Sequence, residues 1–153
     1  GHGAQLRFIE QMPLDAGHTW DRSMMVTQVE ILESLATRWH LEPVPGRGAG
    51  PAERWRLDGG PHTVGVIASV TAPFCGDCDR LRLTADGQLR NCLFSTTEYD
   101  LLPVLRAAGV DVEPDELGVE RMLRSCVHGK LPGHAINDPS FLQPSRGMNA
   151  IGG

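Results

Sequence analysis

Residues 74–94 read FCGDCDRLRLTADGQLRNCLF, and this stretch organises the rest of the chain. It holds three of the four cysteines, Cys75, Cys78 and Cys92, in the pattern C-x2-C-x13-C. Soft thiolate ligands select zinc or iron–sulfur clusters. Two cysteines at this short spacing can share one metal centre, and the third must fold back to meet them. The stretch therefore predicts a metal site that a turn of the chain closes.

The turn lies at Ala85-Asp86-Gly87, between leucine-rich segments. A two-residue Asp-Gly loop would mix polar and apolar side chains on each face of the hairpin. A three-residue loop with Gly87 in the left-handed conformation separates them, and register follows the buried face. The pairs that this longer loop brings together are Leu83 with Leu89, Arg82 with Arg90, and Arg80 with Cys92. The sequence thus predicts an anion site, formed by Arg80 and Arg82, beside the metal site.

A structural zinc knuckle is the alternative to such an open site. A closed zinc site needs four protein ligands, and Cys126 is the remaining cysteine. Cys126 falls on an apolar stripe of a predicted helix, which favours a buried thiol rather than a ligand. The stripe consists of Val119, Met122, Leu123, Cys126 and Val127. A fourth ligand could then be His128, His134 or water, or the site could keep an open metal position.

The composition narrows the class of protein. A net charge of −5 argues against non-specific nucleic-acid binding, which requires a basic face. No apolar run approaches the roughly 18 residues of a membrane span, and no signal peptide is recognisable. Cysteines in a C-x2-C arrangement without a secretion signal indicate a reducing compartment, so we expect a cytoplasmic protein without membrane partners.

The predicted secondary structure is mixed α/β. A strand at residues 5–12 and a helix that begins at Thr27, with Glu30 completing a capping box, form a strand–loop–helix unit typical of a barrel. A Pro- and Gly-rich linker follows at residues 42–52. The further elements expected are strands at residues 54–57 and 62–70, which join the hairpin in one small antiparallel sheet, helices at 101–108 and 114–128, and an irregular tail.

Three residues outside the hairpin stand out. Arg7 lies in a strand expected to be buried, where an arginine needs either an anion or a structural ion pair, for example with Glu10. Met12 lies at the carboxyl end of that strand, where barrel enzymes place site residues, although a lone methionine also suits a core. Ile67 would ordinarily be a core residue.

Residues 74–94, together with the early LRFIEQM and the ending MNAIGG, resemble the C-terminal part of the GTP 3′,8-cyclases. These are radical S-adenosylmethionine enzymes of molybdenum cofactor biosynthesis, and the resemblance covers essentially the whole chain. The family's N-terminal C-x3-C-x2-C motif does not occur here. The resemblance therefore implies a fragment. Residues 1–41 would be the last unit of an incomplete (β/α) TIM-type barrel, and residues 42–153 a domain that binds a cluster and GTP.

The resemblance also implies roles for individual residues. Cys75, Cys78 and Cys92 would hold a 4Fe–4S cluster with one iron free of cysteine. The expected contacts are Met12 to S-adenosylmethionine, and Arg7, Ile67, Arg80, Leu81 and Arg82 to GTP. Four residues would serve catalysis, namely Arg80, Arg82, Gly152 and Gly153. A terminal Gly-Gly is a hallmark of the family, and its tail is thought to enter the active site.

The reaction implied is the conversion of GTP to 3′,8-cyclo-7,8-dihydroguanosine 5′-triphosphate. The full enzyme uses S-adenosylmethionine and a second 4Fe–4S cluster to start it, so we expect this fragment to be inactive alone. Its expected partners are GTP, a second copy in a homodimer, or the missing N-terminal barrel. The alternative function is a non-catalytic zinc- or iron–sulfur-binding module with a structural or interaction role. An open strand edge could also lead the chain to self-associate.

Overall fold

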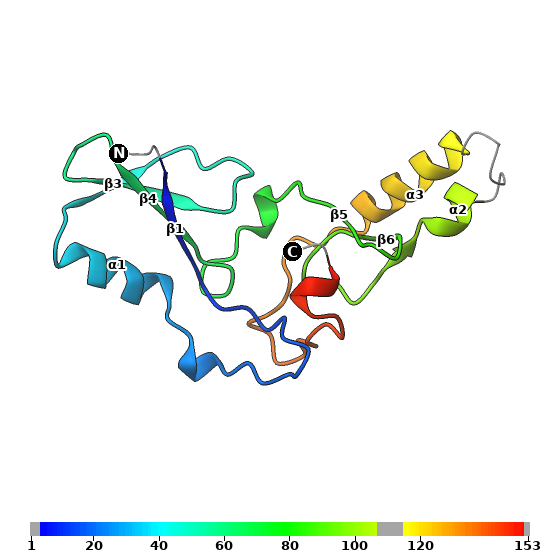
Figure 1. Cartoon of the computed structure of the whole chain (residues 1–153), viewed down its shortest axis with the longest axis horizontal. Coiled ribbons are helices and arrows are strands. Elements are labelled where there is room, and N and C mark those ends of the chain that lie inside the picture. The colour runs from blue at the N-terminus through cyan, green and yellow to red at the C-terminus, as the bar shows by residue number, and fades with distance from the viewer. Residues whose placement is uncertain (1–3, 107–114, 152–153) are drawn as a thin grey trace. The chain divides into compact units, whose positions relative to one another are not determined.

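A computed structural model of the chain describes residues 4–106 and 115–151 (Figure 1). The chain forms two compact units, which we call unit 1, within residues 1–13 and 20–79, and unit 2, within residues 14–19 and 80–153. The elements of unit 1 are β1 Leu6–Ile9, α1 Gln28–Ala36, β2 Leu41–Val44, β3 Glu53–Leu57, β4 Thr63–Ile67, and 3-10 turns at Arg22–Met24 and Cys75–Asp77. Those of unit 2 are β5 Arg82–Leu83, β6 Gln88–Arg90, β7 Tyr99–Asp100, α2 Leu102–Arg106, α3 Glu116–His128, and a 3-10 turn at Met148–Ala150.

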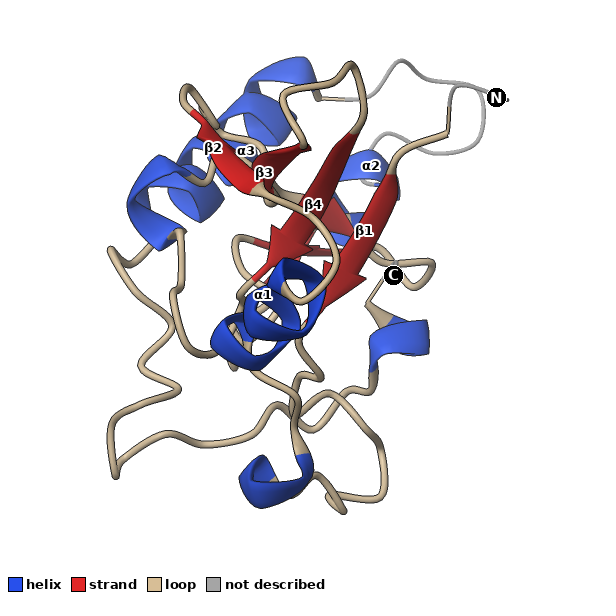
Figure 2. Ribbon diagram, turned by 90° about the vertical axis from the view of Figure 1, so that its left-hand side faces the viewer, coloured by secondary structure: helices blue, strands red, loops and turns tan. Residues whose placement is uncertain are grey.

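Unit 1 is a four-stranded sheet in the order β1-β4-β3-β2, with α1 packed against it (Figure 2). β1 runs parallel to β4, and the other neighbours are antiparallel. Trp55, Val64 and Val66 form the buried centre, against which the apolar stripe of α1 lies. This stripe includes Ile31, Leu32 and Leu35, as the helical spacing predicted.

The start of α1 confirms the predicted capping box. The Thr27 hydroxyl accepts from the Glu30 N–H at 3.3 Å, and the Glu30 carboxylate accepts from the Thr27 N–H at 2.8 Å. Each residue therefore satisfies a backbone donor that the first turn of a helix leaves without an intrahelical partner.

Two expectations for unit 1 were wrong. The strand at residues 5–12 was expected to be buried, but β1 leaves Leu6 61% and Ile9 54% exposed. β1 is the edge strand of the sheet, so among the described residues only β4 pairs with it. The linker at residues 42–52 begins with strand β2, which pairs with β3. Pro43 is tolerated there because β2 is also an edge strand, where a missing N–H costs no ladder bond.

Unit 2 contains a three-stranded antiparallel sheet in the order β5-β6-β7. The predicted hairpin register is confirmed for two pairs, Arg82 with Arg90 and Leu83 with Leu89, whereas the predicted pair of Arg80 with Cys92 lies beyond the ends of β5 and β6 and stays a prediction. Gly87 adopts a positive φ of 80°, as the three-residue loop requires. A Cβ at Gly87 would stand 2.4 Å from Cγ of Leu102, so the close packing of the loop on α2 also excludes a side chain.

The hairpin forms the expected small antiparallel sheet in unit 2, but the strands predicted at residues 54–57 and 62–70 do not join it, so that part of the prediction was wrong. β1 and β3 occupy the two edges of β4, while β7 occupies the second edge of β6. β3 and β4, the strands expected to join the hairpin, each pair with two neighbours and have no edge left for it. The result is two separate sheets. The division of the chain into residues 1–41 and 42–153 stays a prediction.

The helices of unit 2 cover its sheet. Leu89, Leu101 and Cys126 form the buried centre, and Val119 and Met122 of α3 pack against it. Cys126 is 0% exposed, which confirms the predicted buried thiol, and this burial raises the pKa of the thiol. Leu123 and Val127 of the same predicted stripe are 37% and 49% exposed.

The helix boundaries follow local capping. The Asp100 carboxylate accepts from the Leu102 N–H at 3.2 Å, and the Asp115 carboxylate caps α3 through the Gly118 N–H at 3.0 Å. The predicted end of the first helix at residues 108–109, and Pro114, lie outside the described residues. None of the helices formed by the described residues combines the length and hydropathy that a membrane-spanning segment requires.

Candidate functional site

The cysteine pair occupies a single turn of 3-10 helix. The Cys78 N–H donates to the Cys75 carbonyl at 3.2 Å, and both side chains are half-buried. This turn keeps the two residues of the C-x2-C pattern within one loop of backbone. The local geometry therefore suits a shared metal centre.

Arg47 supports this turn from the Gly-rich segment after β2. Its guanidinium pairs with the Asp77 carboxylate at 2.8 Å and lies 5.1 Å from the centroid of the Phe74 ring. It also donates to the Gly50 carbonyl at 3.0 Å. Asp77 stands between the two cysteines, and Arg47 compensates a carboxylate charge that would otherwise disfavour thiolates there. The sequence prediction missed Arg47 because it treated residues 42–52 as a linker.

Glu10 fixes the segment that leads to the cysteine turn. Its side chain is 1% exposed, and its carboxylate accepts from the N–H groups of Val70, Thr71 and Gln28 at 2.8–2.9 Å and from the Thr71 hydroxyl. Burial raises its pKa, but the hydrogen bonds from Thr71, Val70 and Gln28 outweigh burial, so the pKa lies below its usual value. Glu10 thus joins β1, the start of α1 and the loop after β4.

The other unit 1 residues predicted for the site lie on β1 and β4. Arg7 is exposed, and its Nε donates to the side-chain oxygen of Gln5 at 3.0 Å. It lies opposite Gly65 of β4, and a Cβ added at Gly65 would stand 3.1 Å from Cγ of Arg7. Met12 is half-buried just after β1. The Ile67 carbonyl accepts from the Glu10 N–H at 3.1 Å at the end of β4.

The hairpin places the predicted unit 2 residues in different surroundings. Arg82 is half-buried on β5, whereas Leu81 packs against the core around Leu89. Arg90, opposite Arg82, is 2% exposed and pairs with Glu98, so its charge is compensated within the unit. Cys92 is half-buried and its sulfur accepts from the Phe94 N–H at 3.4 Å. Backbone donors to sulfur are a recurring feature that tunes iron–sulfur clusters.

Lys130 braces the base of the hairpin. Its ammonium donates to the carbonyls of Arg80 at 2.8 Å and Asn91 at 2.6 Å. These carbonyls belong to the residues beside Leu81 and Cys92, so Lys130 fixes both arms of the hairpin and adds a positive charge there. The sequence prediction placed Lys130 in the irregular tail. The local signal that could have singled out Lys130 is its position directly after Gly129, which ends α3.

The histidines considered as ligands have other surroundings. The His134 ring lies 4.6 Å from the Phe94 ring, and its Nδ1 accepts from the Ile136 N–H at 3.3 Å. His128 is exposed at the end of α3. Across residues 4–106 and 115–151, no group of three His, Cys, Asp or Glu side chains is arranged to hold a metal ion. Cys75 and Cys78 belong to unit 1 and Cys92 to unit 2, so the three-cysteine ligand set stays a prediction.

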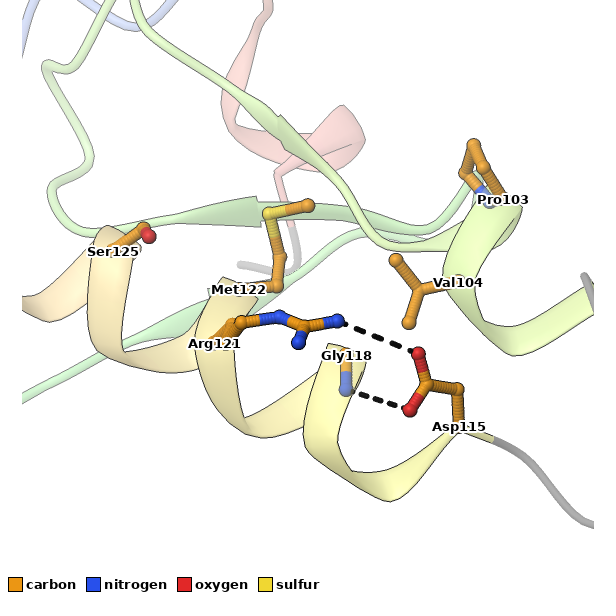
Figure 3. A pocket seen from close by; sticks show the side chains of 7 residues that line it. All are labelled: Pro103, Val104, Asp115, Gly118, Arg121, Met122 and Ser125. Atoms are coloured by element: carbon orange, nitrogen blue, oxygen red, sulfur yellow. Dashed lines mark hydrogen bonds and ion pairs between the residues drawn. The ribbon is translucent and has the colours of Figure 1, made fainter.

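Unit 2 also has a cavity of 370 Å³ between α2 and α3 (Figure 3). Arg121 lines it, but its guanidinium pairs with the Asp115 carboxylate at 3.6 Å. Val104 and Met122 supply apolar walls. The residues described around this cavity include none of the predicted site residues, which lie in unit 1 at the cysteine turn and on β1 and β4, and in unit 2 on the hairpin.

Comparisons with known proteins give a family match and several relatives. The family described as Molybdenum Cofactor Synthesis C matches residues 4–136. The chain belongs to this family. Its relatives include a GTP 3′,8-cyclase of Streptomyces coelicolor, 56% identical over 154 residues, and one of a Mycobacterium species, 52% identical over 153 residues. The GTP 3′,8-cyclase 2 of Mycobacterium tuberculosis is 50% identical over 156 residues.

This member of the Molybdenum Cofactor Synthesis C family spans only part of those relatives. The matches cover 99% of the chain but 42–44% of the relatives' own length. Gly152 and Gly153, the predicted catalytic residues of the tail, lie outside the described residues.

Proposed function

We propose that the chain is the GTP-binding, cluster-holding region of a GTP 3′,8-cyclase. The observation that carries this proposal is the hairpin, which pairs Arg82 with Arg90, two residues before Cys92, in the register that the segregation of the leucines predicted. The identity of 50–56% to proteins named GTP 3′,8-cyclase supports it. The reaction proposed for the whole protein is the conversion of GTP to 3′,8-cyclo-7,8-dihydroguanosine 5′-triphosphate with S-adenosylmethionine.

Three cysteine thiols are ligands of the kind that a 4Fe–4S cluster requires. Cys75 and Cys78 share a turn whose carboxylate is compensated by Arg47, and the Cys92 sulfur already accepts a backbone hydrogen bond. Cys75, Cys78 and Cys92 would hold the cluster. When bound, it would supply one iron without a cysteine ligand, at which the guanine base could bind. Lys130 and Glu10 would keep the ligand-bearing segments in place.

The cationic residues would bind the triphosphate. Arg80 and Arg82 lie on the hairpin beside Cys92, and charge-assisted bonds from arginine are the strong way to fix a phosphate. Arg7 on β1 would provide a further phosphate contact, while the main chain at Ile67 and Leu81 would face the nucleotide. Met12 would pack against S-adenosylmethionine, and Gly152 and Gly153 would approach the substrate.

The parallel pairing of β1 with β4, and the packing of α1 on this sheet, are consistent with the last unit of a partial (β/α) barrel. The chain lacks a C-x3-C-x2-C motif. We therefore expect that reconstituted chain incubated with GTP, S-adenosylmethionine and a reductant yields no cyclised product. Any turnover would contradict this expectation. Homodimer formation or association with a barrel on another chain is part of the same proposal.

The proposal is tested by GTP binding. Arg82→Ala should weaken binding by about 1.5–3 kcal/mol, the range for hydrogen bonds to charged groups. Arg124→Ala is the matched control, because Arg124 lies on α3 in an exposed ion pair with Glu120. Isothermal titration of GTP into anaerobically reconstituted protein measures both variants. Equal dissociation constants for Arg82→Ala and the unmodified chain would contradict the assigned role of Arg82.

The alternative is a non-catalytic module that holds zinc through the cysteines and a histidine or water. Metal analysis separates the two functions, because the proposed site requires iron and sulfide and the alternative requires zinc. An iron–sulfur protein is also brown, whereas a zinc protein is colourless. Tightly held zinc that iron and sulfide cannot replace under anaerobic conditions would favour the structural module.

A further inference from the structure

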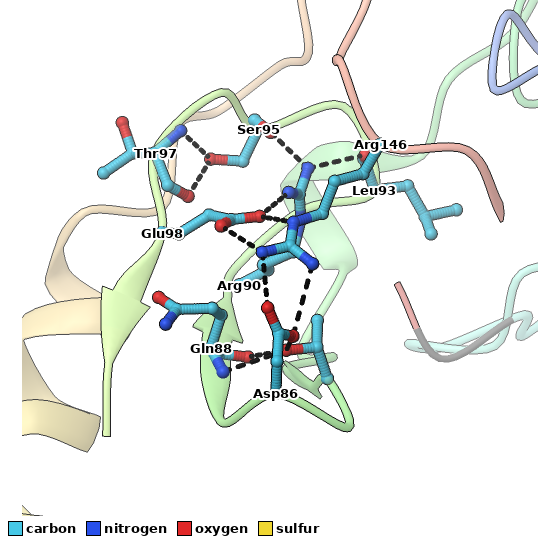
Figure 4. A network of polar contacts seen from close by, with 9 residues as sticks. Asp86, Gln88, Arg90, Leu93, Ser95, Thr97, Glu98 and Arg146 are labelled. Carbon is cyan, nitrogen blue, oxygen red and sulfur yellow. Dashed lines mark hydrogen bonds and ion pairs between the residues drawn. The ribbon is translucent and has the colours of Figure 1, made fainter. Parts of the chain in front are cut away.

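Arg146, near the end of the chain, binds two carboxylates at once (Figure 4). Its Nη1 and Nη2 donate to the two oxygens of Asp86 at 3.2 and 2.7 Å. Its Nε and Nη2 lie 2.7 and 3.0 Å from the two oxygens of Glu98. Every guanidinium nitrogen is therefore engaged in a fork geometry, which gives both strength and direction.

The two carboxylates are each held by a second residue of unit 2. Asp86 lies in the β5–β6 loop, where the Thr84 hydroxyl also donates to it. Glu98 precedes β7 and is held by Arg90, whose guanidinium is buried and also donates to the carbonyls of Leu93 and Ser95. Because Arg90 binds Glu98 independently of Arg146, replacement of Arg146 should leave the β5–β6 loop and Glu98 in place.

Two further hydrogen bonds attach the tail to the backbone carbonyls of Leu14 and Asp15. The Met148 N–H donates to the Leu14 carbonyl at 2.9 Å, and the Gln143 side chain donates to the Asp15 carbonyl at 3.1 Å. Ile151 is 0% exposed. In the sequence, Arg146 lies between Gln143 and Met148, which make these two hydrogen bonds, and its side chain connects the tail to the hairpin loop.

The ion pair is charged at neutral pH. Hydrogen bonds from Arg146 and Thr84 lower the pKa of Asp86 to about 2, and the same contacts with Asp86 and Glu98 raise the pKa of Arg146. A single exposed ion pair contributes little, but Arg146 is only 28% exposed and bonds two carboxylates in one network.

We propose that Arg146 is a positioning residue that fixes the tail, residues 143–151, on the hairpin through Asp86 and Glu98. The functional part of this inference rests on the proposed GTP site. There, Arg146 connects the tail to the hairpin that carries Arg82 and Cys92.

Hydrogen exchange measured by mass spectrometry tests the attachment in the whole 153-residue chain. Arg146→Gln should raise the exchange rate of tail peptides by about tenfold, while peptides of α3 and β6 keep their rates. Arg146→Lys keeps the charge and should recover part of the protection. Arg124→Gln, the same change in an exposed ion pair, should alter nothing. Tail exchange equal to that of the unmodified chain in Arg146→Gln would overturn the proposal.

GTP addition tests the positioning role and separates it from the proposed function. In the reconstituted chain, GTP should slow exchange of the tail. In Arg146→Gln, GTP should bind within about twofold of the same dissociation constant yet no longer protect the tail. Equal protection in both proteins would overturn the positioning role. Absence of GTP binding by the unmodified chain would overturn the proposed function, while the exchange comparison without GTP would still decide the attachment.

Discussion

Replacement of Glu10 by glutamine tests the physical account of unit 1. Glutamine has one acceptor oxygen and one NH2 group where glutamate has two acceptor oxygens. Oε2 of Glu10 faces the N–H groups of Val70 and Thr71, which can only donate, so the amide oxygen should occupy that position. The NH2 group then faces the Thr71 hydroxyl, which can turn to accept, and the Gln28 N–H, which cannot.

The magnitude follows from this arrangement. The partly buried Gln28 N–H loses its acceptor at a cost of about 1–3 kcal/mol, and the remaining bonds lose charge assistance of roughly 1 kcal/mol each. The lower cost of burying a neutral amide offsets part of this loss. The free energy of unfolding should therefore fall by about 2–4 kcal/mol. At a urea slope of about 1–2 kcal/mol per M, the midpoint should fall by about 1–3 M.

Tryptophan fluorescence is the right assay because all three tryptophans, Trp20, Trp39 and Trp55, belong to unit 1. Glu53→Gln is the matched control, since this exposed carboxylate accepts from the Gln28 side chain at 3.0 Å. Its effect should stay within about 0.5 kcal/mol. Equal urea midpoints for Glu10→Gln and Glu53→Gln would show that the buried Glu10 carboxylate does not stabilise unit 1 in this way.

The dependence of stability on pH, compared between the unmodified chain and Glu10→Gln, gives a second test. The pKa of Glu10 is lowered in the folded state from its usual 4.5. The contribution of the carboxylate to stability is therefore present above pH 4.5 and is lost as the pH falls through the folded-state pKa. The difference in midpoint between the unmodified chain and Glu10→Gln should be full at pH 7 and shrink below pH 4.5. A difference that grows on acidification would contradict this sign.

Three further predictions concern unit 2. Gly87→Ala should destabilise it by more than about 1 kcal/mol in thermal unfolding followed by circular dichroism, because φ is positive and Leu102 blocks a Cβ. Gly133→Ala, where a Cβ meets nothing within 4 Å, is its control, and equal losses would count against the packing argument. Cys126 should resist alkylation in the native protein and react in urea, since it is 0% exposed and its thiol pKa is raised; equally fast labelling in both conditions would contradict its burial. Asp86→Asn should lower the melting temperature at pH 7, and the loss should shrink as the pH falls from the usual pKa of 3.8 to the folded-state pKa of about 2, because the unfolded state takes up the proton first; a loss independent of pH would argue against the ion pair with Arg146.

The sequence predicted the features that short-range rules govern. The hairpin register followed from a left-handed glycine and from the segregation of leucines, and both are properties of a few adjacent residues. The capping box at Thr27 and Glu30 and the burial of Cys126 followed from helical spacing in the same way. In each case, local sequence determines which side chains face each other.

The features that the sequence did not predict depend on distant partners. Arg146 meets Asp86 across 60 positions, and Glu10 meets Thr71 across 61, so no local spacing signals either contact. β2 was missed because its proline argues against a strand, and only the edge position of β2 makes Pro43 acceptable. The separation into two sheets depended on β1 occupying an edge of β4, which is again a long-range pairing.

The proposed binding of GTP at a cluster held by the cysteines can be measured in the chain itself. The chain is reconstituted anaerobically, iron and sulfide are counted, and GTP is titrated into the electron paramagnetic resonance spectrum of the reduced protein. We expect about four irons per chain and a signal that GTP alters, because the proposed site leaves one iron without a cysteine ligand. A cluster whose spectrum is unchanged by saturating GTP would contradict it.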